Sequence, residues 1–168
     1  MSPAEIIDLL GLESLPGEGG FFVQTYLCPE TIPRAGLPAR YSSARPFGSA
    51  ILYLLTPETW SALHRLPSDE IFHFHLGDPV TMLQLGPDGQ SRTVTLGPDL
   101  RSGHQVQVVV PRGTWQGSAL EPGGQWALLG ATVAPGFDWS DLEFPDIEEL
   151  VGLFPDRRDL ILRLGRLQ

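Results

Sequence analysis

The fold is decided by residues 62–77, which read Ala62-Leu63-His64-Arg65-Leu66-Pro67-Ser68-Asp69-Glu70-Ile71-Phe72-His73-Phe74-His75-Leu76-Gly77. Residues two apart on a strand lie on the same face. A strand over residues 70–76 therefore places Glu70, Phe72, Phe74 and Leu76 on one face. The other face carries Ile71, His73 and His75, so a single carboxylate lies opposite a pair of imidazoles.

Short apolar runs continue on both sides of this stretch, and turn signals such as Pro87-Asp88-Gly89 separate them. The chain has 19 glycines and 16 prolines among 168 residues, which is too many for a helical bundle. We expect strands at residues 21–27, 50–55, 70–76, 80–85, 91–96, 106–110, 118–120 and 126–133. This many short strands predict an all-β sandwich or barrel.

Helices are expected only at the two ends of the chain. Ser2 is a suitable N-cap, Pro3 fits the first helical position, and Gly11 ends a pattern that places Ile6, Leu9 and Leu10 on one face. Beyond residue 136, apolar residues recur at helical spacing over 147–154 and 160–164. We expect one domain, residues 1–168, with these helices packed on its outside.

The charge pattern narrows the class of partner. The formal net charge is -9, all 11 positive residues are arginines, and no lysine is present. Lysine-dependent chemistry is therefore excluded, and binding to nucleic acid or to an anionic membrane is disfavoured because it needs clustered positive charge. The single cysteine, Cys28, excludes an internal disulfide and a Cys-rich zinc site. A small neutral or polar ligand is the expected partner.

No apolar run approaches the roughly 20 residues of a membrane span. Residues 1–15 carry Glu5, Asp8 and Glu13 where a signal peptide would be basic and then apolar. We expect a cytoplasmic protein.

Two motifs resemble those of the cupin superfamily. His64, Glu70 and Gly77 have the spacing of the first motif, Gly-x5-His-x-His-x3-Glu-x6-Gly, but Leu66 replaces its second histidine. Pro111-Arg112-Gly113-Thr114-Trp115-Gln116 resembles the core of the second motif, with Gln116 in place of the histidine. Two of the four usual metal ligands are therefore replaced.

The chain is also similar to one family within this superfamily, cupin-5 or DUF985. The resemblance rests on blocks in the expected order over residues 18–143: Glu18-Gly19-Gly20-Phe21-Phe22-Val23-Gln24-Thr25-Tyr26, residues 49–55, residues 64–79, residues 109–116 and Val133-Ala134-Pro135-Gly136-Phe137-Asp138. It implies a cupin jelly-roll barrel (a double-stranded β-helix) like that of the sugar-nucleotide epimerases of the RmlC type. The resemblance also implies a homodimer. No reaction is established for the family as a whole. The family often has His-Pro and Arg-Glu-Thr where this chain has Pro16-Gly17 and Val23-Gln24-Thr25.

His64 and Glu70 are the candidate catalytic residues, because the motif resemblance places both inside the barrel. His64 is suited to act as a base. Glu70 has three open roles: it orients His64, holds a substrate hydroxyl, or pairs with a buried arginine. Burial near another acid would raise its pKa.

Five further residues are candidate ligand-binding residues. Tyr53 and Trp115 offer apolar faces with one polar tip, and Gln24 and Gln116 are amides on otherwise apolar strands. Asp138 follows Pro135-Gly136 near the expected mouth of the barrel. For the aromatic residues, core packing is almost as good an explanation.

We expect no tightly held metal cofactor, because neutral glutamine is a poor ligand for a transition metal. A weak divalent site at His64 and Glu70 is the alternative. If Glu70 faces the barrel interior, His73 and His75 face outward unless a bulge intervenes. Packing or a subunit interface then explains this pair better than metal binding, because no third ligand has matching spacing.

The favoured function is therefore binding of a small sugar-like or carbonyl-containing metabolite, with isomerase, epimerase or lyase chemistry as its extension. A non-catalytic ligand-binding or sensing protein is the alternative. A metal-dependent enzyme such as a dioxygenase is the third. The residues do not decide whether the protein is an enzyme.

Overall fold

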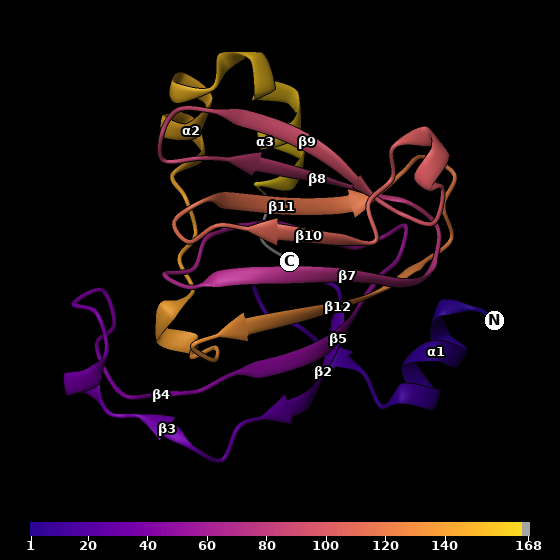
Figure 1. The fold of residues 1–168 in the computed structure, drawn as a ribbon. Coiled ribbons are helices and arrows are strands. Elements are labelled where there is room, and N and C mark those ends of the chain that lie inside the picture. Colours follow the sequence, from indigo (N-terminus) through magenta and orange to yellow (C-terminus); the bar gives the residue numbers. More distant parts are fainter. Residues whose placement is uncertain (166–168) are drawn as a thin grey trace.

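The computed structural model describes residues 1–165, which form two antiparallel β-sheets packed face to face, with short helices at both ends of the chain (Figure 1). The larger sheet has the strand order β1-β2-β5-β12-β7-β10. Its strands are β1 (Glu13–Ser14), β2 (Phe21–Leu27), β5 (Ser49–Leu55), β12 (Ala127–Ala134), β7 (Asp69–Gly77) and β10 (Gln107–Val110). This sheet carries Tyr53 and Glu70.

The smaller sheet has the order β6-β11-β8-β9. Its strands are β6 (Trp60–His64), β11 (Trp115–Leu120), β8 (Val80–Leu85) and β9 (Ser91–Leu96). A separate ribbon of β3 (Thr31–Ile32) and β4 (Arg45–Pro46) lies beside the larger sheet, below it in Figure 1. The smaller sheet carries His64 and Gln116.

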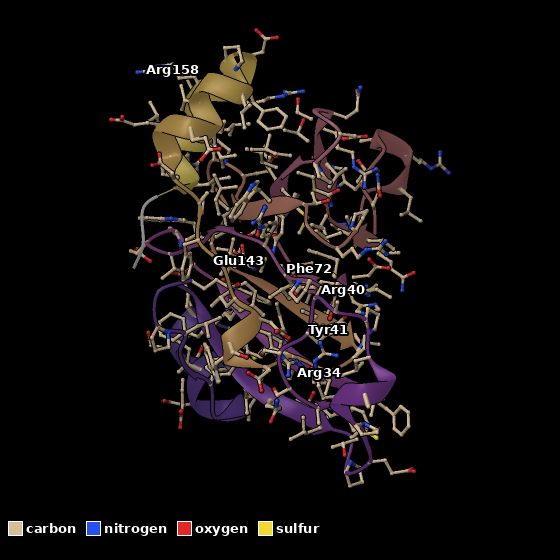
Figure 2. The ribbon with its side chains drawn as sticks, turned by 90° about the vertical axis from the view of Figure 1, so that its left-hand side faces the viewer. Arg34, Arg40, Tyr41, Phe72, Glu143 and Arg158 are labelled. Carbon is tan, nitrogen blue, oxygen red and sulfur yellow. The ribbon has the colours of Figure 1, made fainter. Side chains whose placement is uncertain are left out.

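The helices cover two different surfaces. α1 (Pro3–Leu10) begins with the Ser2 cap and ends at Gly11 in the left-handed conformation, as predicted. α2 (Ile147–Leu153) and α3 (Arg158–Leu164) pack on the outside of the smaller sheet, and Figure 2 shows Arg158 at that end of the molecule. Four single-turn 3₁₀ helices join these elements: η1 (Arg34–Gly36), η2 (Leu100–Ser102), η3 (Trp139–Asp141) and η4 (Pro155–Arg157).

The core lies between the two sheets. It is formed by inward-facing residues of both sheets, among them Tyr53, Phe72, Met82, Val110 and Leu129, and Figure 2 shows Phe72 in the interior. A second cluster joins the smaller sheet to α2 and α3, and a third joins α1 to Leu54 and Leu128. The smaller sheet is therefore covered on both faces, which is why β6, β8 and β11 are buried at almost every position.

Strand β7 follows the predicted alternation over its first half. Glu70 and Phe72 are buried, whereas Ile71 and His73 are only partly buried. A β-bulge opposite Leu128 and Leu129 then breaks the alternation, because Leu129 pairs with Phe74 and Leu128 pairs with Leu76. Leu76 is 55 % exposed, so its predicted place on the inner face is wrong. Leu9, predicted on the apolar face of the first helix, is also exposed.

Candidate functional site

A cavity of about 400 Å³ opens at the inner face of the larger sheet. Its lining comes from β1, β2, β5, β6, β7, β12 and the loop after β12. The polar lining residues are Glu13, Glu18, Gln24, Ser49, Tyr53, His64 and Glu70. The apolar lining includes Phe22, Ile51, Leu66, Phe72, Val133, Phe137 and Trp139. A pocket of this size that is mostly apolar, with a few convergent polar groups, is typical of a small-molecule site.

His64 lies at the buried end of this cavity, on the last residue of β6, and is 2 % exposed. Its Nδ1 lies 2.8 Å from the carbonyl oxygen of Ala62. A carbonyl oxygen only accepts hydrogen bonds, so Nδ1 carries a proton. In the neutral ring, Nε2 therefore has its lone pair directed toward the site.

Gln116 connects His64 to Glu70. Strands β11 and β6 pair so that Gln116 lies directly opposite His64. The Gln116 amide nitrogen lies 2.7 Å from His64 Nε2 and donates to Glu70 Oε2 at 3.3 Å. One amide group thus joins the imidazole of one sheet to the carboxyl group of the other.

Glu70 is a desolvated acid, since its side chain is 8 % exposed and its one hydrogen bond within the described chain is the one from Gln116. Burial, with the nearby Glu18 as a second cause, raises the pKa of Glu70 to about 8. The hydrogen bond from Gln116 opposes this shift. The Glu70 carboxyl group is therefore protonated at neutral pH and able to donate a hydrogen bond.

Glu18 completes the acidic group, and sequence reasoning did not single it out. Its Oε2 lies 3.8 Å from His64 Nε2, and its Oε1 accepts a hydrogen bond of 3.0 Å from the Ser61 hydroxyl. Its backbone carbonyl accepts from the Ala62 amide at 2.7 Å, which fixes the segment against β6. The available signal was the position of Glu18 in the Glu18-Gly19-Gly20 block of the family resemblance.

The two glycines explain how Glu18 reaches the cavity. Gly19 and Gly20 have φ of 92° and 72°, in the left-handed region that favours glycine. A Cβ at Gly20 would lie 2.8 Å from the Tyr53 ring and 2.9 Å from the Leu54 carbonyl oxygen. The Tyr53 hydroxyl donates to the Gly19 carbonyl at 2.8 Å, so Tyr53 lines the cavity and also holds this turn.

The donor set does not fit the metal that cupin barrels commonly hold. Leu66 has no donor atom, and the Gln116 amide N–H group points at the two atoms, His64 Nε2 and Glu70 Oε2, that a metal would need. Within residues 1–165, no group of three or more His, Cys, Asp or Glu side chains has an arrangement suited to a metal ion. The amide nitrogen occupies the bridging place between imidazole and carboxyl.

The open end of the cavity has an aromatic rim, made of Phe22, Phe137 and Trp139. The Trp139 ring meets Phe22 edge to face at 6.5 Å and Phe137 edge to face at 5.2 Å, measured between ring centroids. Trp139 is 56 % exposed, so its ring is accessible from solvent.

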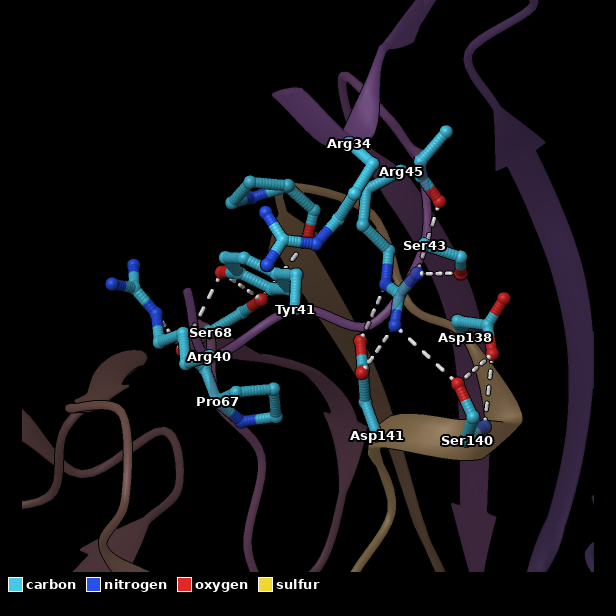
Figure 3. Close-up of polar contacts among 12 residues, drawn as sticks. Arg34, Arg40, Tyr41, Ser43, Arg45, Pro67, Ser68, Asp138, Ser140 and Asp141 are labelled. Carbon is cyan, nitrogen blue, oxygen red and sulfur yellow. Dashed lines mark hydrogen bonds and ion pairs between the residues drawn. The ribbon is translucent and has the colours of Figure 1, made fainter. Parts of the chain in front are cut away.

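A buried ion pair holds this rim in place (Figure 3). Arg45 on β4 is fully buried and donates from Nε to Asp141 Oδ2 at 2.7 Å, with a second bond from Nη2 to Oδ1. It also donates to the Ser140 hydroxyl at 3.4 Å. Asp138 caps the same 3₁₀ turn by accepting from the Ser140 amide. Trp139 therefore lies in a turn whose other residues are fixed.

The structure brings together some of the predicted site residues and separates others. His64, Glu70, Tyr53 and Gln24 line the cavity, with Gln24 exposed at its edge, and Gln116 lies directly behind the polar end. Trp115 does not line it, because its ring packs under the Arg65 guanidinium, 4.3 Å away, on the helix-covered side of the smaller sheet. Asp138 caps a turn and does not line the cavity.

Asp141, His73 and His75 all lie outside the cavity lining. Asp141 is the buried partner of Arg45. His73 lies on the outer face and contacts Gln107 and Thr132. Its ring stacks on His75 at 6.4 Å, and burial, followed by the charge of His73, lowers the pKa of His75.

Two facing antiparallel sheets, with a histidine and a glutamate from opposite sheets at the end of a cavity, define a cupin-type jelly-roll barrel. The sequence profile of the family described as Cupin superfamily (DUF985) matches residues 4–145, and this chain belongs to that family. Solved cupin domains of low identity show the same fold.

Three relatives illustrate the similarity. The crystal structure of protein SO0799 from Shewanella oneidensis is 32 % identical, with a TM-score of 0.86 over 100 % of this chain and 99 % of that chain. A hypothetical protein from Leishmania major is 28 % identical, with a TM-score of 0.86 over 98 % and 99 % of the two chains. The uncharacterized protein YML079W of Saccharomyces cerevisiae is 29 % identical over 147 residues, 80 % of this chain and 73 % of that protein.

In the part of the chain that the structure describes, no helix has the length and apolar character needed to cross a membrane.

Proposed function

We propose that the protein binds a small carbonyl-containing metabolite in this cavity and transfers a proton beside the carbonyl group, as an isomerase or epimerase does. The observation that carries the proposal is the pair of acids at the buried end. Glu70 is protonated near neutral pH, while Glu18 is the more accessible carboxylate beside it. Two acids whose environments differ are the usual basis for separating an acid from a base.

The reaction needs no co-reactant. Glu18 removes a proton from the carbon next to the carbonyl, and the Glu70 carboxyl donates its proton to the carbonyl oxygen. The C–H electrons form the new C=C bond of an enol. In a hydroxy-carbonyl compound this enol is an enediol: Glu18 returns the proton to the former carbonyl carbon, and the hydroxyl on the neighbouring carbon gives its proton to Glu70 and becomes the new carbonyl group, which gives the isomer. When the enol turns over first, Glu18 returns the proton to the other face of the same carbon and the enol hydroxyl returns its proton to Glu70, which gives the epimer. Elimination of a group next to the enol would give the lyase variant.

His64 acts in this scheme as a positioning residue. Its Nδ1 is anchored on the Ala62 carbonyl, and its Nε2 accepts from the Gln116 amide that also contacts Glu70. Because the ring also lies 3.8 Å from Glu18, it fixes the spacing of the two acids.

The test is hydrogen exchange in D₂O. A panel of hydroxy-ketones, keto acids and aldoses is incubated with the protein, and loss of the C–H signal next to the carbonyl is followed by NMR. We expect exchange into at least one compound, reduced by about 10²-fold or more in Glu70→Gln and in Glu18→Gln. Glu148→Gln, which removes an exposed carboxylate on α2, is the matched control and should exchange at the wild-type rate. Exchange that survives both cavity variants would overturn the proposal.

A non-catalytic binding protein is the second candidate. It is favoured by one contact, the donation of the Gln116 amide to His64 Nε2, which occupies the atom that a histidine base would use. Compounds that raise the melting temperature without any exchange would support this candidate, because a ligand of the native state stabilises it whether or not it reacts.

A further inference from the structure

The charges that line the cavity have one sign. Glu13 and Glu18 line it, together with the Glu70 carboxyl group, which is protonated at neutral pH, and none of the cavity-lining residues within 1–165 is an arginine. Protein sites that bind phosphate use arginine, lysine or clustered backbone N–H groups. A phosphorylated ligand would meet three carboxyl groups here and no cationic side chain.

The net charge of the whole chain also favours a cationic ligand over an anionic one. Its formal net charge of -9 attracts cations to the mouth of the cavity and repels anions. Arg45, which contacts the turn that carries Trp139, is fully buried, and its guanidinium donates to Asp141, Ser140 and Ser43. It is therefore not free to bind an anionic group.

The rim adds an independent preference for positive charge. The faces of Trp and Phe rings carry negative potential and attract a cation within about 6 Å of the ring centroid. Both Trp139 and Phe137 line the cavity, and their edge-to-face contacts fix the ring orientations. Glu13 lies directly opposite Phe22 in the pairing of β1 with β2, so a carboxylate borders the same rim.

The buried end of the cavity also has few hydrogen-bond donors. Glu70 accepts a single hydrogen bond, at 3.3 Å, and Glu18 accepts one from Ser61. His64 Nε2 lies 3.8 Å from Glu18, beyond hydrogen-bond distance. Two adjacent acids with so few donors leave room for a donor that comes with the ligand.

We infer that the ligand carries a positive charge and no phosphate: an organic ammonium, either a protonated amine or a quaternary ammonium, held between the aromatic rim and the carboxylates of Glu13 and Glu18. The inference rests on the proposed function, because it names the class of molecule that the same cavity accepts. Its uncharged part extends toward Glu70 and His64. The Arg45–Asp141 pair acts as a positioning element for the rim.

The test compares two probes of equal shape. Choline has a quaternary nitrogen, whereas 3,3-dimethylbutan-1-ol has a carbon atom in its place, so they differ only in charge. Binding is measured by calorimetry at low salt, and quenching of tryptophan fluorescence is followed in parallel. We expect choline to bind about tenfold or more tightly than the alcohol, the range that a desolvated cation–π contact supports.

Two variants localise the effect. Trp139→Leu removes the exposed ring, and Glu18→Gln removes one charge with little change of shape. Each should weaken choline binding by about tenfold. Glu18→Gln should leave binding of the alcohol unchanged, and Glu148→Gln should leave both probes unchanged. Melting temperatures of all variants are measured first, so that a folding defect is recognised.

Each outcome has one meaning. Equal or tighter binding of the alcohol, or competition by inorganic phosphate or glucose 6-phosphate, would overturn the inference. Binding of uncharged carbonyl compounds in the cavity without binding of choline would also overturn it and leave the proposed function standing. If neither choline nor any compound of the carbonyl panel binds, both proposals fail.

Discussion

The side-chain amide nitrogen of Gln116 lies 2.7 Å from Nε2 of His64, its partner on the neighbouring strand of the smaller sheet. A metal-binding barrel would need a third imidazole and a cation at this place. Here the amide satisfies the imidazole lone pair and also reaches Glu70. The replacement of histidine by glutamine therefore gives a polar cluster in which the amide nitrogen contacts both groups, while the Gln116 side-chain oxygen has no hydrogen-bond partner within the described chain.

The first prediction concerns metal content. We expect the purified protein to contain well under one equivalent of transition metal, because Leu66 and Gln116 supply no strong donor. The double variant Leu66→His, Gln116→His adds two imidazoles to His64 and Glu70 and should bind about one equivalent of nickel or manganese. Elemental analysis after purification without chelator checks both statements. One equivalent of metal in the wild-type protein, lost in His64→Ala, would contradict them.

The second prediction is a pH dependence that comes from Glu70. Its pKa in the folded state is about 8, above the usual value of 4.5 for a glutamate, so the folded state retains a proton that the unfolded state releases. The free energy of unfolding should therefore be highest, as far as Glu70 is concerned, below about pH 4.5, fall as the pH rises, and level off above about pH 8. Glu70→Gln cannot titrate, so it should remove this slope and be more stable than wild type at pH 9. Urea denaturation at pH 5, 7 and 9 measures this. An identical slope in the two proteins would exclude Glu70 as its source.

Apolar runs separated by turn residues predicted most of the strands. Strands β2, β5, β7, β8, β9, β10 and β12 lie within one residue of their predicted bounds. Strand β6 was not predicted, because Ser61-Ala62-Leu63-His64 is buried without any alternation. Helices cover the outer face of its sheet, and no local pattern reveals such cover. Trp115 was misplaced for the same reason.

Within the site, the motif spacing predicted that His64 and Glu70 line the same cavity, but nothing in the sequence predicted that Glu18 lies beside them. Glu18 reaches the cavity through two left-handed glycines, and its carbonyl oxygen accepts a hydrogen bond from the amide of Ala62, 44 residues further along the chain. The Arg45–Asp141 pair joins residues 96 apart. Contacts of this kind depend on tertiary structure and leave no periodic signal in the chain.

The third prediction tests the turn that carries Glu18. Gly20 and Gly89 have similar positive φ values, 72° and 79°. A Cβ at Gly20 would meet the Tyr53 ring at 2.8 Å, whereas nothing lies within 4 Å of one at Gly89. Gly89→Ala should cost about 1 kcal/mol, the cost of the backbone conformation alone. Gly20→Ala should cost at least about 1 kcal/mol more, because the added methyl group clashes. Equal losses in urea denaturation would show that Tyr53 moves aside freely.

The fourth prediction is a homodimer. Strand β1 pairs only with Phe21 and Phe22, so the same edge of β2 is unpaired from residue 23 onward within the described chain. Tyr26 and Leu27 on this strand are each 52 % exposed. An unpaired edge with exposed apolar side chains is a site that a second copy can cover. Light scattering at micromolar concentration should give twice the mass of one chain, and Leu27→Lys should shift the mass toward that of a monomer. A wild-type mass equal to one chain would contradict the prediction.

The last prediction separates two ion pairs of different burial. Arg45 and Asp141 are 0 % and 7 % exposed, whereas Arg65 and Glu143 are 39 % and 54 % exposed. Removing one partner of a buried pair leaves an uncompensated charge, so Asp141→Ala should destabilise the fold by about 3–5 kcal/mol. Glu143→Ala should cost less than about 1 kcal/mol, because solvent screens an exposed pair.

The two variants should also differ at the cavity, since Asp141 holds the turn of Trp139 and Glu143 does not. In Asp141→Ala the edge-to-face contacts of Trp139 with Phe22 and Phe137 lose their support. The near-ultraviolet circular dichroism of these rings should weaken at temperatures where the variant is still folded, with Glu143→Ala as the matched control. The double variant Arg45→Met, Asp141→Leu removes both charges and should recover most of the lost stability, because replacing a buried pair by apolar side chains is often neutral. If it recovers none, the pair stabilises this turn through its hydrogen-bond geometry as well as through charge compensation.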